Sequence, residues 1–139
     1  MNSMKYNSIL VTGASGSLGS AIIRKFESDE IRTFALYRNA NHVKFNKHSS
    51  VVRFIQDSVE WPSLIEKLKP EVVILCDWQG VAGSDRDNIE TQNQNVTRWS
   101  SIIDSAILAG TSRIIAFGSQ AEISNEQDNI TSDVDFSPR

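Results

Sequence analysis

Residues 12–19 read Thr-Gly-Ala-Ser-Gly-Ser-Leu-Gly, and this stretch decides the expected fold. It follows a short run of β-forming residues at 8–12 and leads into apolar residues at helical spacing. These apolar residues are Leu18, Ile22, Ile23 and Phe26. A glycine-rich turn between a strand and an amphipathic helix opens a β-α-β unit, and the stretch therefore predicts such a unit here.

Strands and helices are expected to alternate through the rest of the sequence. Apolar runs at 33–37, 51–55, 72–76 and 114–117 predict four further strands. The run at 72–76 is apolar throughout, which is typical of a strand buried on both faces. Such alternation with short connections predicts parallel pairing through right-handed crossovers.

Two further helices are expected between these strands. Pro62 suits the first turn of a helix that ends at Lys69 and Pro70, with an apolar face of Leu64, Ile65 and Leu68. A long helix is predicted at about 88–109, and Gly110 is its expected C-terminal stop. Its inward side chains are expected to be Val96, Trp99, Ile103, Ala106 and Ile107.

The pattern predicts an α/β fold, a Rossmann-like three-layer sandwich with a parallel sheet of about five strands in the order 3-2-1-4-5. We expect residues 1–119 to form this domain, incomplete at its C-terminal side, and the acidic residues 120–139 to form a loop or tail. The apolar run at 114–117 would then lie at a sheet edge, which predicts self-association or marginal stability.

Composition bounds the classes of function. The 139 residues carry a net charge of −3, which gives none of the basic character expected of nucleic-acid binding. The single cysteine, Cys76, is compatible with a reducing compartment. No apolar run has the length of a membrane span, and no secretory signal is evident, so we expect a soluble, cytoplasmic protein.

The glycine turn predicts a site for a pyrophosphate. Gly13 would allow the tight turn, Gly16 would let the backbone approach the phosphates, and Gly19 would let helix and strand pack closely. The N–H groups at the start of the helix would then face the anion. The alternative is a tight turn without a ligand, because glycines also occur in ordinary connections of this kind.

The spacing G-x-x-G-x-x-G resembles that of the extended short-chain dehydrogenase/reductase family, which includes the nucleotide-sugar epimerases and dehydratases. Residues 57–75, 77–83 and 95–122 resemble successive segments of the same family. The Gly-Ser-Gln-Ala-Glu ending at 118–122 is most similar to members that modify deoxysugar nucleotides for surface polysaccharides. The resemblance implies a dinucleotide cofactor and, in the complete enzyme, a nucleotide-sugar substrate.

Several residues fall at the family's cofactor-contacting positions. They are Gly13, Ser15, Gly16, Ser17, Leu18, Gly19, Arg38, Asp57, Cys76, Asp77, Trp78 and Asn95. A cation at Arg38 favours the 2′-phosphate of NADP(H), with NAD(H) possible if Arg38 is only a solvated surface residue. The resemblance implies that Asp57 accepts a hydrogen bond from the adenine amino group, although a carboxylate there also suits a helix N-terminus.

Three of these positions leave alternatives open. Asp77 replaces the small apolar residue that the family usually has there. Cys76 has no histidine near it in the sequence, which favours a small buried hydrophobe over a nucleophile. Asn95 resembles an asparagine that supports the family's active site, whereas a mid-helix polar residue is more often exposed.

The resemblance implies that Ser119 is the family's catalytic hydroxyl, and the alternative is a loop serine. Gln120 and Ala121 replace the acid pair of the dehydratases, which argues against dehydration. The family's Tyr-x-x-x-Lys pair is absent from these residues, because Tyr6 and Tyr37 are followed four positions on by Leu10 and Asn41.

We therefore expect the NAD(P)-binding portion of a nucleotide-sugar epimerase or reductase, with no turnover of its own and the possibility of a homo-oligomer. The alternative is a non-catalytic dinucleotide-binding or partner-binding module. His42 and His48 lie in a polar stretch without a carboxylate or cysteine cluster, so no metal site is predicted.

Overall fold

The computed structural model describes residues 6–38, 49–57 and 60–118 of the chain. The five strands in this part are β1 (Ser8–Val11), β2 (Arg32–Tyr37), β3 (Val52–Gln56), β4 (Val72–Leu75) and β5 (Arg113–Ala116). The helices are α1 (Ser17–Ser28), α2 (Trp61–Leu68) and α3 (Ile89–Leu108), with a short 3-10 helix η2 (Gly83–Asp87) before α3.

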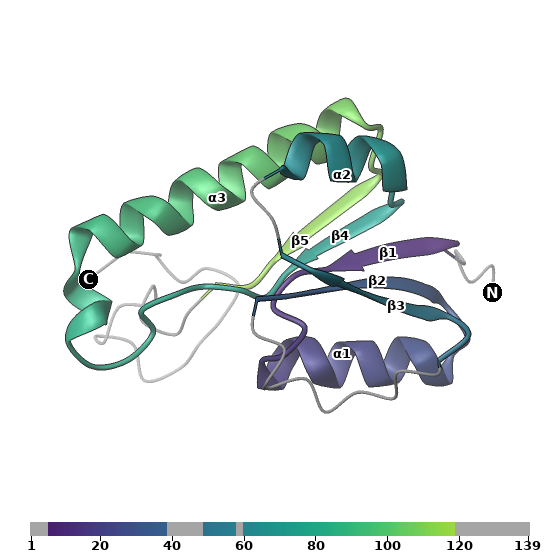
Figure 1. The fold of residues 1–139 in the computed structure, drawn as a ribbon, viewed down its shortest axis with the longest axis horizontal. Helices are drawn as coiled ribbons and strands as arrows, with labels where there is room; N and C mark the ends of the chain where they lie inside the picture. Colours follow the sequence, from purple (N-terminus) through teal and green to yellow (C-terminus); the bar gives the residue numbers. More distant parts are fainter. Residues whose placement is uncertain (1–5, 39–48, 58–59, 119–139) are drawn as a thin grey trace, which may run out of the picture.

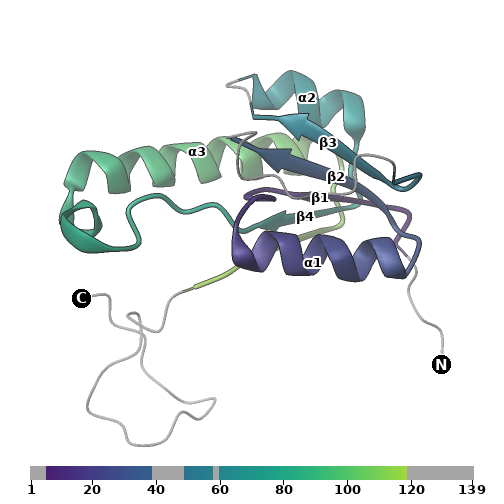
Figure 2. The ribbon, with the colours of Figure 1, turned by 60° about the horizontal axis from the view of Figure 1, so that its bottom comes forward.

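The strands form one parallel sheet in the order β3-β2-β1-β4-β5, which confirms the predicted topology. Helix α1 covers one face of the sheet, and α2 and α3 lie side by side on the other (Figures 1 and 2). The strand order reverses between β1 and β4, and in open sheets of this kind the ligand crevice lies at the carboxyl ends of the strands beside that reversal.

Alternate residues of the strands pack into two separate hydrophobic cores, because successive side chains of a strand point to opposite faces of the sheet. Leu10, Phe34 and Leu75 pack on the α2 and α3 side, together with Ile65. Val11, Ala35 and Ile74 pack on the α1 side. The middle strands β1 and β4 are buried along their whole length, so their carboxyl ends are held rigidly.

The expected inward face of α3 is partly wrong. Val96 and Ile107 are 54% and 62% exposed, whereas Ile102 is fully buried. Trp99, Ile103 and Ala106 do pack against the core, as expected. The helix is therefore rotated relative to the prediction, and this rotation brings Asn95 and Ile102 inward.

The first helix also differs from the expected face at its start. Leu18 is 43% exposed, while Ile23 is buried and Ile22 and Phe26 pack against the core. Leu18 lies in the first turn of α1, directly after the glycine turn, and its side chain does not reach the core.

The predicted helix ends agree with the structure. Pro62 lies in the first turn of α2, and Lys69 after α2 adopts a left-handed conformation. Asn88 caps α3 by accepting a hydrogen bond from the Thr91 N–H, and Gly110 after α3 has φ of +81°. In the part of the chain that the structure describes, no helix has both the length and the apolar character needed to cross a membrane.

Strand β5 lies at one edge of the sheet formed by the described residues. Ile114 and Ile115 are half-buried and Phe117 is 44% exposed, so this edge is apolar. Self-association through the edge stays a prediction. Ser119 and the acidic residues 120–139 lie outside the described residues.

Candidate functional site

The glycine turn joins β1 to α1 and is tied to both neighbouring strands. The Thr12 N–H donates to the Ile74 carbonyl at 2.9 Å, and the Ala14 N–H donates to the Leu36 carbonyl at 2.8 Å. Gly13 has φ of +65°, and a Cβ there would lie 2.7 Å from the Cys76 carbonyl oxygen. Only glycine fits this position without strain.

The other two glycines of the motif differ in what surrounds them. A Cβ on Gly19 would collide with the backbone of Gly13, so Gly19 is required for the close packing of α1 against the turn. Gly16 is exposed, and a Cβ there would meet only the Gly13 carbonyl oxygen, at 3.3 Å. The fold therefore needs Gly13 and Gly19, whereas Gly16 keeps the outer surface of the turn free of side chains.

The start of α1 is the part of the turn that fits a phosphate group. Gly16 is the residue before the helix, with extended φ and ψ of −76° and 165°, and no side chain caps the first turn. The first N–H groups of a helix have no partner within it, and they carry the positive end of its dipole. Ser15 and Ser17 flank Gly16 at the surface, so the geometry suits the pyrophosphate of a dinucleotide.

Asn95 holds the loop after β4, which like the glycine turn lies at the carboxyl ends of the strands. The Asn95 side-chain oxygen accepts from the Gln79 N–H at 2.9 Å, and the Asn95 amide nitrogen donates to the Gln79 carbonyl at 2.8 Å. Asn95 is 2% exposed, so its polar side chain is buried and bonded to the loop, and the alternative of a simply exposed residue is wrong. Gln92 adds to this brace by accepting from Trp78 Nε1 at 2.7 Å.

A charged cluster lies beneath this loop. Arg98 from α3 donates from Nη1 and Nη2 to the two carboxylate oxygens of Asp57, at 3.2 Å and 2.6 Å. Its Nε donates to Asp77 Oδ2 at 2.6 Å. The other oxygen of Asp77 accepts from the Thr12 hydroxyl, so the cluster reaches the glycine turn itself. Side chains of Asp57 and Asp77 are only 9% and 3% exposed.

The charges within the cluster influence one another. Burial alone would lower the pKa of Arg98, but hydrogen bonds and charge from Asp57 and Asp77 outweigh burial and raise it. The guanidinium also lies 4.6 Å from the ring centroid of Trp61, in a cation–π contact. Burial, and then the negative charge of Asp77, raise the pKa of the Cys76 thiol to about 11. A thiol held in its protonated form supports the expectation that Cys76 is not a nucleophile.

The structure thus brings most of the expected site residues to the carboxyl ends of the strands. Arg38 follows β2 and is exposed, and Trp78 is 37% exposed beside the Asn95 loop. His42 and His48 lie outside the described residues. Within residues 6–38, 49–57 and 60–118, no group of three or more His, Cys, Asp or Glu side chains could hold a metal ion.

Sequence reasoning missed Arg98, Gln92 and Thr12. Gln92 and Arg98 each lie three residues from Asn95, which places all three on one side of α3. That spacing was the available signal for Arg98. An unpaired acid such as Asp77 in a buried position requires a counterion, and this requirement was the second signal.

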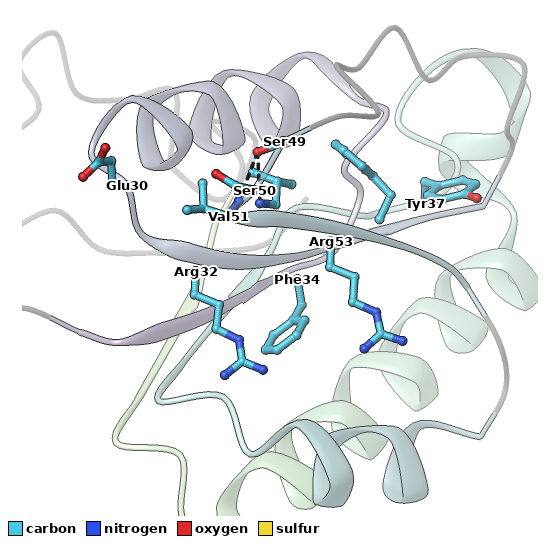
Figure 3. Close-up of a pocket in the computed structure, with 10 residues that line it drawn as sticks. Glu30, Arg32, Phe34, Tyr37, Ser49, Ser50, Val51 and Arg53 are labelled. Atoms are coloured by element: carbon cyan, nitrogen blue, oxygen red, sulfur yellow. Dashed lines mark hydrogen bonds between the residues drawn. The ribbon is translucent and has the colours of Figure 1, made fainter.

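A separate hollow of about 810 Å³ runs along the outer edge of β2 and β3. Figure 3 shows Arg32, Phe34 and Arg53 on one side of the strands and Ser49, Ser50 and Val51 on the other. The Arg32 guanidinium lies 5.0 Å from the ring centroid of Phe34. Both arginines lie in the amino-terminal halves of their strands, away from the glycine turn, although Tyr37 at the carboxyl end of β2 also lines this hollow.

The model of the NAD dependent epimerase/dehydratase family matches residues 9–139. The chain belongs to this family. The family match covers every segment that contributes to the site described above, from the glycine turn after β1 to α3. No curated protein matched the sequence.

Several solved structures share the fold of this chain. The Bordetella bronchiseptica enzyme WbmH, solved with NAD+, is 17% identical with a TM-score of 0.77 over 96% of this chain and 47% of its own. The Campylobacter jejuni UDP-Glc/GlcNAc 4-epimerase is 15% identical with a TM-score of 0.81, over 96% and 44%. The Thermotoga maritima UDP-glucose 4-epimerase is 20% identical with a TM-score of 0.71, over 88% and 41%. The present chain therefore spans less than half the length of each.

Proposed function

We propose that this chain binds NAD(P) across the carboxyl ends of β1 and β4, as the dinucleotide-binding portion of an enzyme that acts on a nucleotide sugar. The observation that carries the proposal is the glycine turn, whose exposed Gly16 leads into a helix start that no side chain caps. Such a helix start binds phosphate through its free N–H groups and its dipole. The bound dinucleotide would supply hydride transfer, and the chain would bind and orient it.

Replacing Gly16 with valine tests this proposal, because it adds bulk at the expected pyrophosphate position with little effect on the fold. The extended conformation at Gly16 is one that valine adopts readily, and a Cβ there meets only one backbone atom, at 3.3 Å. We expect isothermal titration calorimetry to show binding of NADH or NADPH by the wild type and none by Gly16→Val. The matched control is Ala21→Val, on the exposed surface of α1.

Two results would contradict the proposal. Failure of the wild type to bind either cofactor would show that the chain is not a dinucleotide-binding protein. Equal affinity in wild type and Gly16→Val, with melting curves that show both proteins folded, would place the pyrophosphate elsewhere.

The cofactor preference is proposed to be for NADP(H), with NAD(H) as the second possibility. Arg38 supports this preference because it is exposed directly after β2, where a cation can pair with the 2′-phosphate of NADP. NAD+ is the ligand in the WbmH structure, which favours the second possibility. Titration of the wild type and Arg38→Ala with NADPH and NADH decides between them, since only a phosphate contact makes NADPH binding depend on Arg38.

The substrate is proposed to be a nucleotide sugar, with Ser119 as the hydroxyl that contacts its reacting oxygen. Support comes from the family match and from the two UDP-sugar epimerases among the similar structures. The resemblance at residues 118–122 further favours sugars destined for surface polysaccharides. Within the 139 residues neither Tyr6 nor Tyr37 has a lysine four positions on.

We therefore expect the 139-residue chain to bind cofactor without converting UDP-glucose or related sugars. Loss of a general acid–base group costs about 10²–10⁴-fold in rate. Steady conversion of a nucleotide sugar, abolished by Ser119→Ala, would contradict this expectation. Cofactor binding without turnover is equally the behaviour of a non-catalytic dinucleotide-binding module, which a reading frame extending into Tyr-x-x-x-Lys would argue against.

A further inference from the structure

Arg98 reaches from the middle of α3 to the ends of two strands. Its Nη1 and Nη2 form a two-pronged contact with Asp57 after β3, and its Nε and Nη2 both lie 2.6 Å from Asp77 Oδ2 after β4. Trp61 packs on the face of the Arg98 guanidinium, and the Arg98 side chain is 19% exposed. A planar guanidinium held at its face and at three nitrogens has one available orientation.

Asp57 is therefore fixed at both its backbone and its side chain. Its N–H donates to the Tyr37 carbonyl of β2 at 2.7 Å, while Arg98 engages both carboxylate oxygens. Two parallel N–H···O bonds fix the plane of a carboxylate as well as its position. An ionised carboxylate is an acceptor only, and each oxygen keeps a lone pair beyond the one that Arg98 uses.

We propose that Arg98 is a positioning residue that sets the base specificity of the dinucleotide site by fixing Asp57 as a charged acceptor. The inference rests on the proposed function and on the family resemblance, which implies that Asp57 accepts a hydrogen bond from the adenine amino group of the cofactor. A purine with an amino group at position 6 can donate to the free lone pairs of Asp57. A purine with a carbonyl oxygen at position 6 places an acceptor against an acceptor, and Asp57 cannot turn away because Arg98 holds it.

The experiment compares two ligands whose purine rings differ in the group at position 6 and, as a consequence, in the proton that the 6-oxo form carries on N1. NADH or NADPH, whichever the wild type binds more tightly, is titrated in parallel with its hypoxanthine counterpart, which has the 6-oxo group. A hydrogen bond to a charged acceptor predicts that the wild type prefers the adenine form by about ten-fold or more. Wild type that binds both forms equally well would overturn the role of Arg98 and leave the proposed function intact.

Arg98→Lys is the decisive variant, because it keeps the positive charge while a single ammonium cannot hold both Asp57 oxygens in one plane. We expect its preference for the adenine form to fall to about three-fold or less. The ratio of two affinities measured on one protein is insensitive to the folded fraction, which affects both ligands equally. Equal weakening of both ligands, or an unchanged ratio, would overturn the proposal. Arg24→Lys, on the exposed face of α1, is the matched control and should keep the wild-type ratio.

Asp57→Asn separates the positioning role of Arg98 from the base contact itself. An asparagine amide can donate as well as accept, so this variant should bind the hypoxanthine form at least as well as the adenine form. Reversal in Asp57→Asn together with an unchanged ratio in Arg98→Lys would show that Asp57 reads the base without help from Arg98. No change in Asp57→Asn would show that Asp57 does not read the base, which also overturns the proposal for Arg98.

Discussion

The carboxylates of Glu71, at the amino end of the sheet, and Asp77, at its carboxyl end, each accept two hydrogen bonds, but their surroundings differ. Glu71 accepts from the Asn7 N–H and side-chain amide, at 2.9 Å and 2.8 Å, in exposed contacts that join the starts of β1 and β4. The Asp77 side chain is 3% exposed and bonds to Thr12 and Arg98. One end of the sheet is joined by an exposed carboxylate and a neutral amide, and the other by a cluster of charged groups out of water.

The difference indicates why the charges at the carboxyl end are present. Burying two carboxylates and one guanidinium costs solvation free energy that their mutual attraction only partly recovers, and apolar side chains hold strands together at least as well. The exposed Glu71 contact already shows that a strand junction in this fold needs no buried charge. We propose that the cluster of Asp57, Asp77 and Arg98 serves recognition of a ligand rather than stability.

Removing Arg98 should give the largest loss of stability, because it leaves two buried carboxylates without a cation. We expect Arg98→Met to lower the free energy of unfolding by about 3–5 kcal/mol, measured by urea titration followed by circular dichroism. Arg24→Met on exposed α1 is the control, with a change within about 0.5 kcal/mol. A loss below about 1 kcal/mol in Arg98→Met would mean that water or another side chain replaces the guanidinium.

Removing all three charges tests whether the fold needs the buried cluster. The triple variant Asp57→Asn, Asp77→Asn, Arg98→Met should recover most of the stability that Arg98→Met loses, because no uncompensated charge then remains buried. Recovery would support a functional reason for the cluster. A triple variant as unstable as Arg98→Met would show that the cluster is needed for the fold.

Asn95 should give an intermediate effect, since its bonds to Gln79 are neutral. We expect Asn95→Ala to cost about 1–2 kcal/mol, because water can reach the exposed Gln79 backbone once the amide is gone. Asn93→Ala, on the exposed side of the same helix, is the control. Hydrogen exchange at Gln79 should become faster in Asn95→Ala alone, and unchanged exchange would contradict a bracing role for Asn95.

The sequence was sufficient for the fold because its strongest signals are local. The glycine turn, the uninterrupted apolar run at 72–76 and the helix stop at Gly110 each depend on neighbouring residues only, and together they predicted the strand order. The orientation of α3 was not predictable in the same way. Apolar Val96 and Ile107 suited an inward face, but the structure buries Asn95 and Ile102 and leaves Val96 and Ile107 exposed.

The candidate site was predictable in its position but not in its contacts. The family resemblance placed Asp57, Asp77 and Asn95 at cofactor-contacting positions, and strand ends placed Asp57 and Asp77 at the carboxyl ends of the strands. The link between them is Arg98, which is 41 residues from Asp57 and 21 from Asp77. Contacts over such separations depend on the tertiary packing of α3 against α2, which local patterns do not contain.

The smallest effect is expected at the amino end, for Asn7→Ala. Hydrogen bonds from the Asn7 side chain, and then from its backbone, lower the pKa of Glu71 in the folded protein. A carboxyl group whose pKa is lowered by folding adds stability above its unfolded pKa, and this stability is lost as the pH falls through the folded pKa. The side-chain part of that stabilisation is what Asn7→Ala removes.

Urea titrations of wild type and Asn7→Ala should therefore differ slightly at pH 7 and converge as the pH falls through the lowered pKa of Glu71 in the folded protein, because Glu71 is protonated in both states below it. The corresponding difference for Arg98→Met should exceed that for Asn7→Ala at pH 7, because the Glu71 contact is exposed and the Arg98 contacts are buried. A difference for Asn7→Ala that stays constant with pH would show that Asn7 acts through packing of the β1 start and not through the charge of Glu71. A loss in Asn7→Ala as large as that in Arg98→Met would contradict the contrast between the two ends of the sheet.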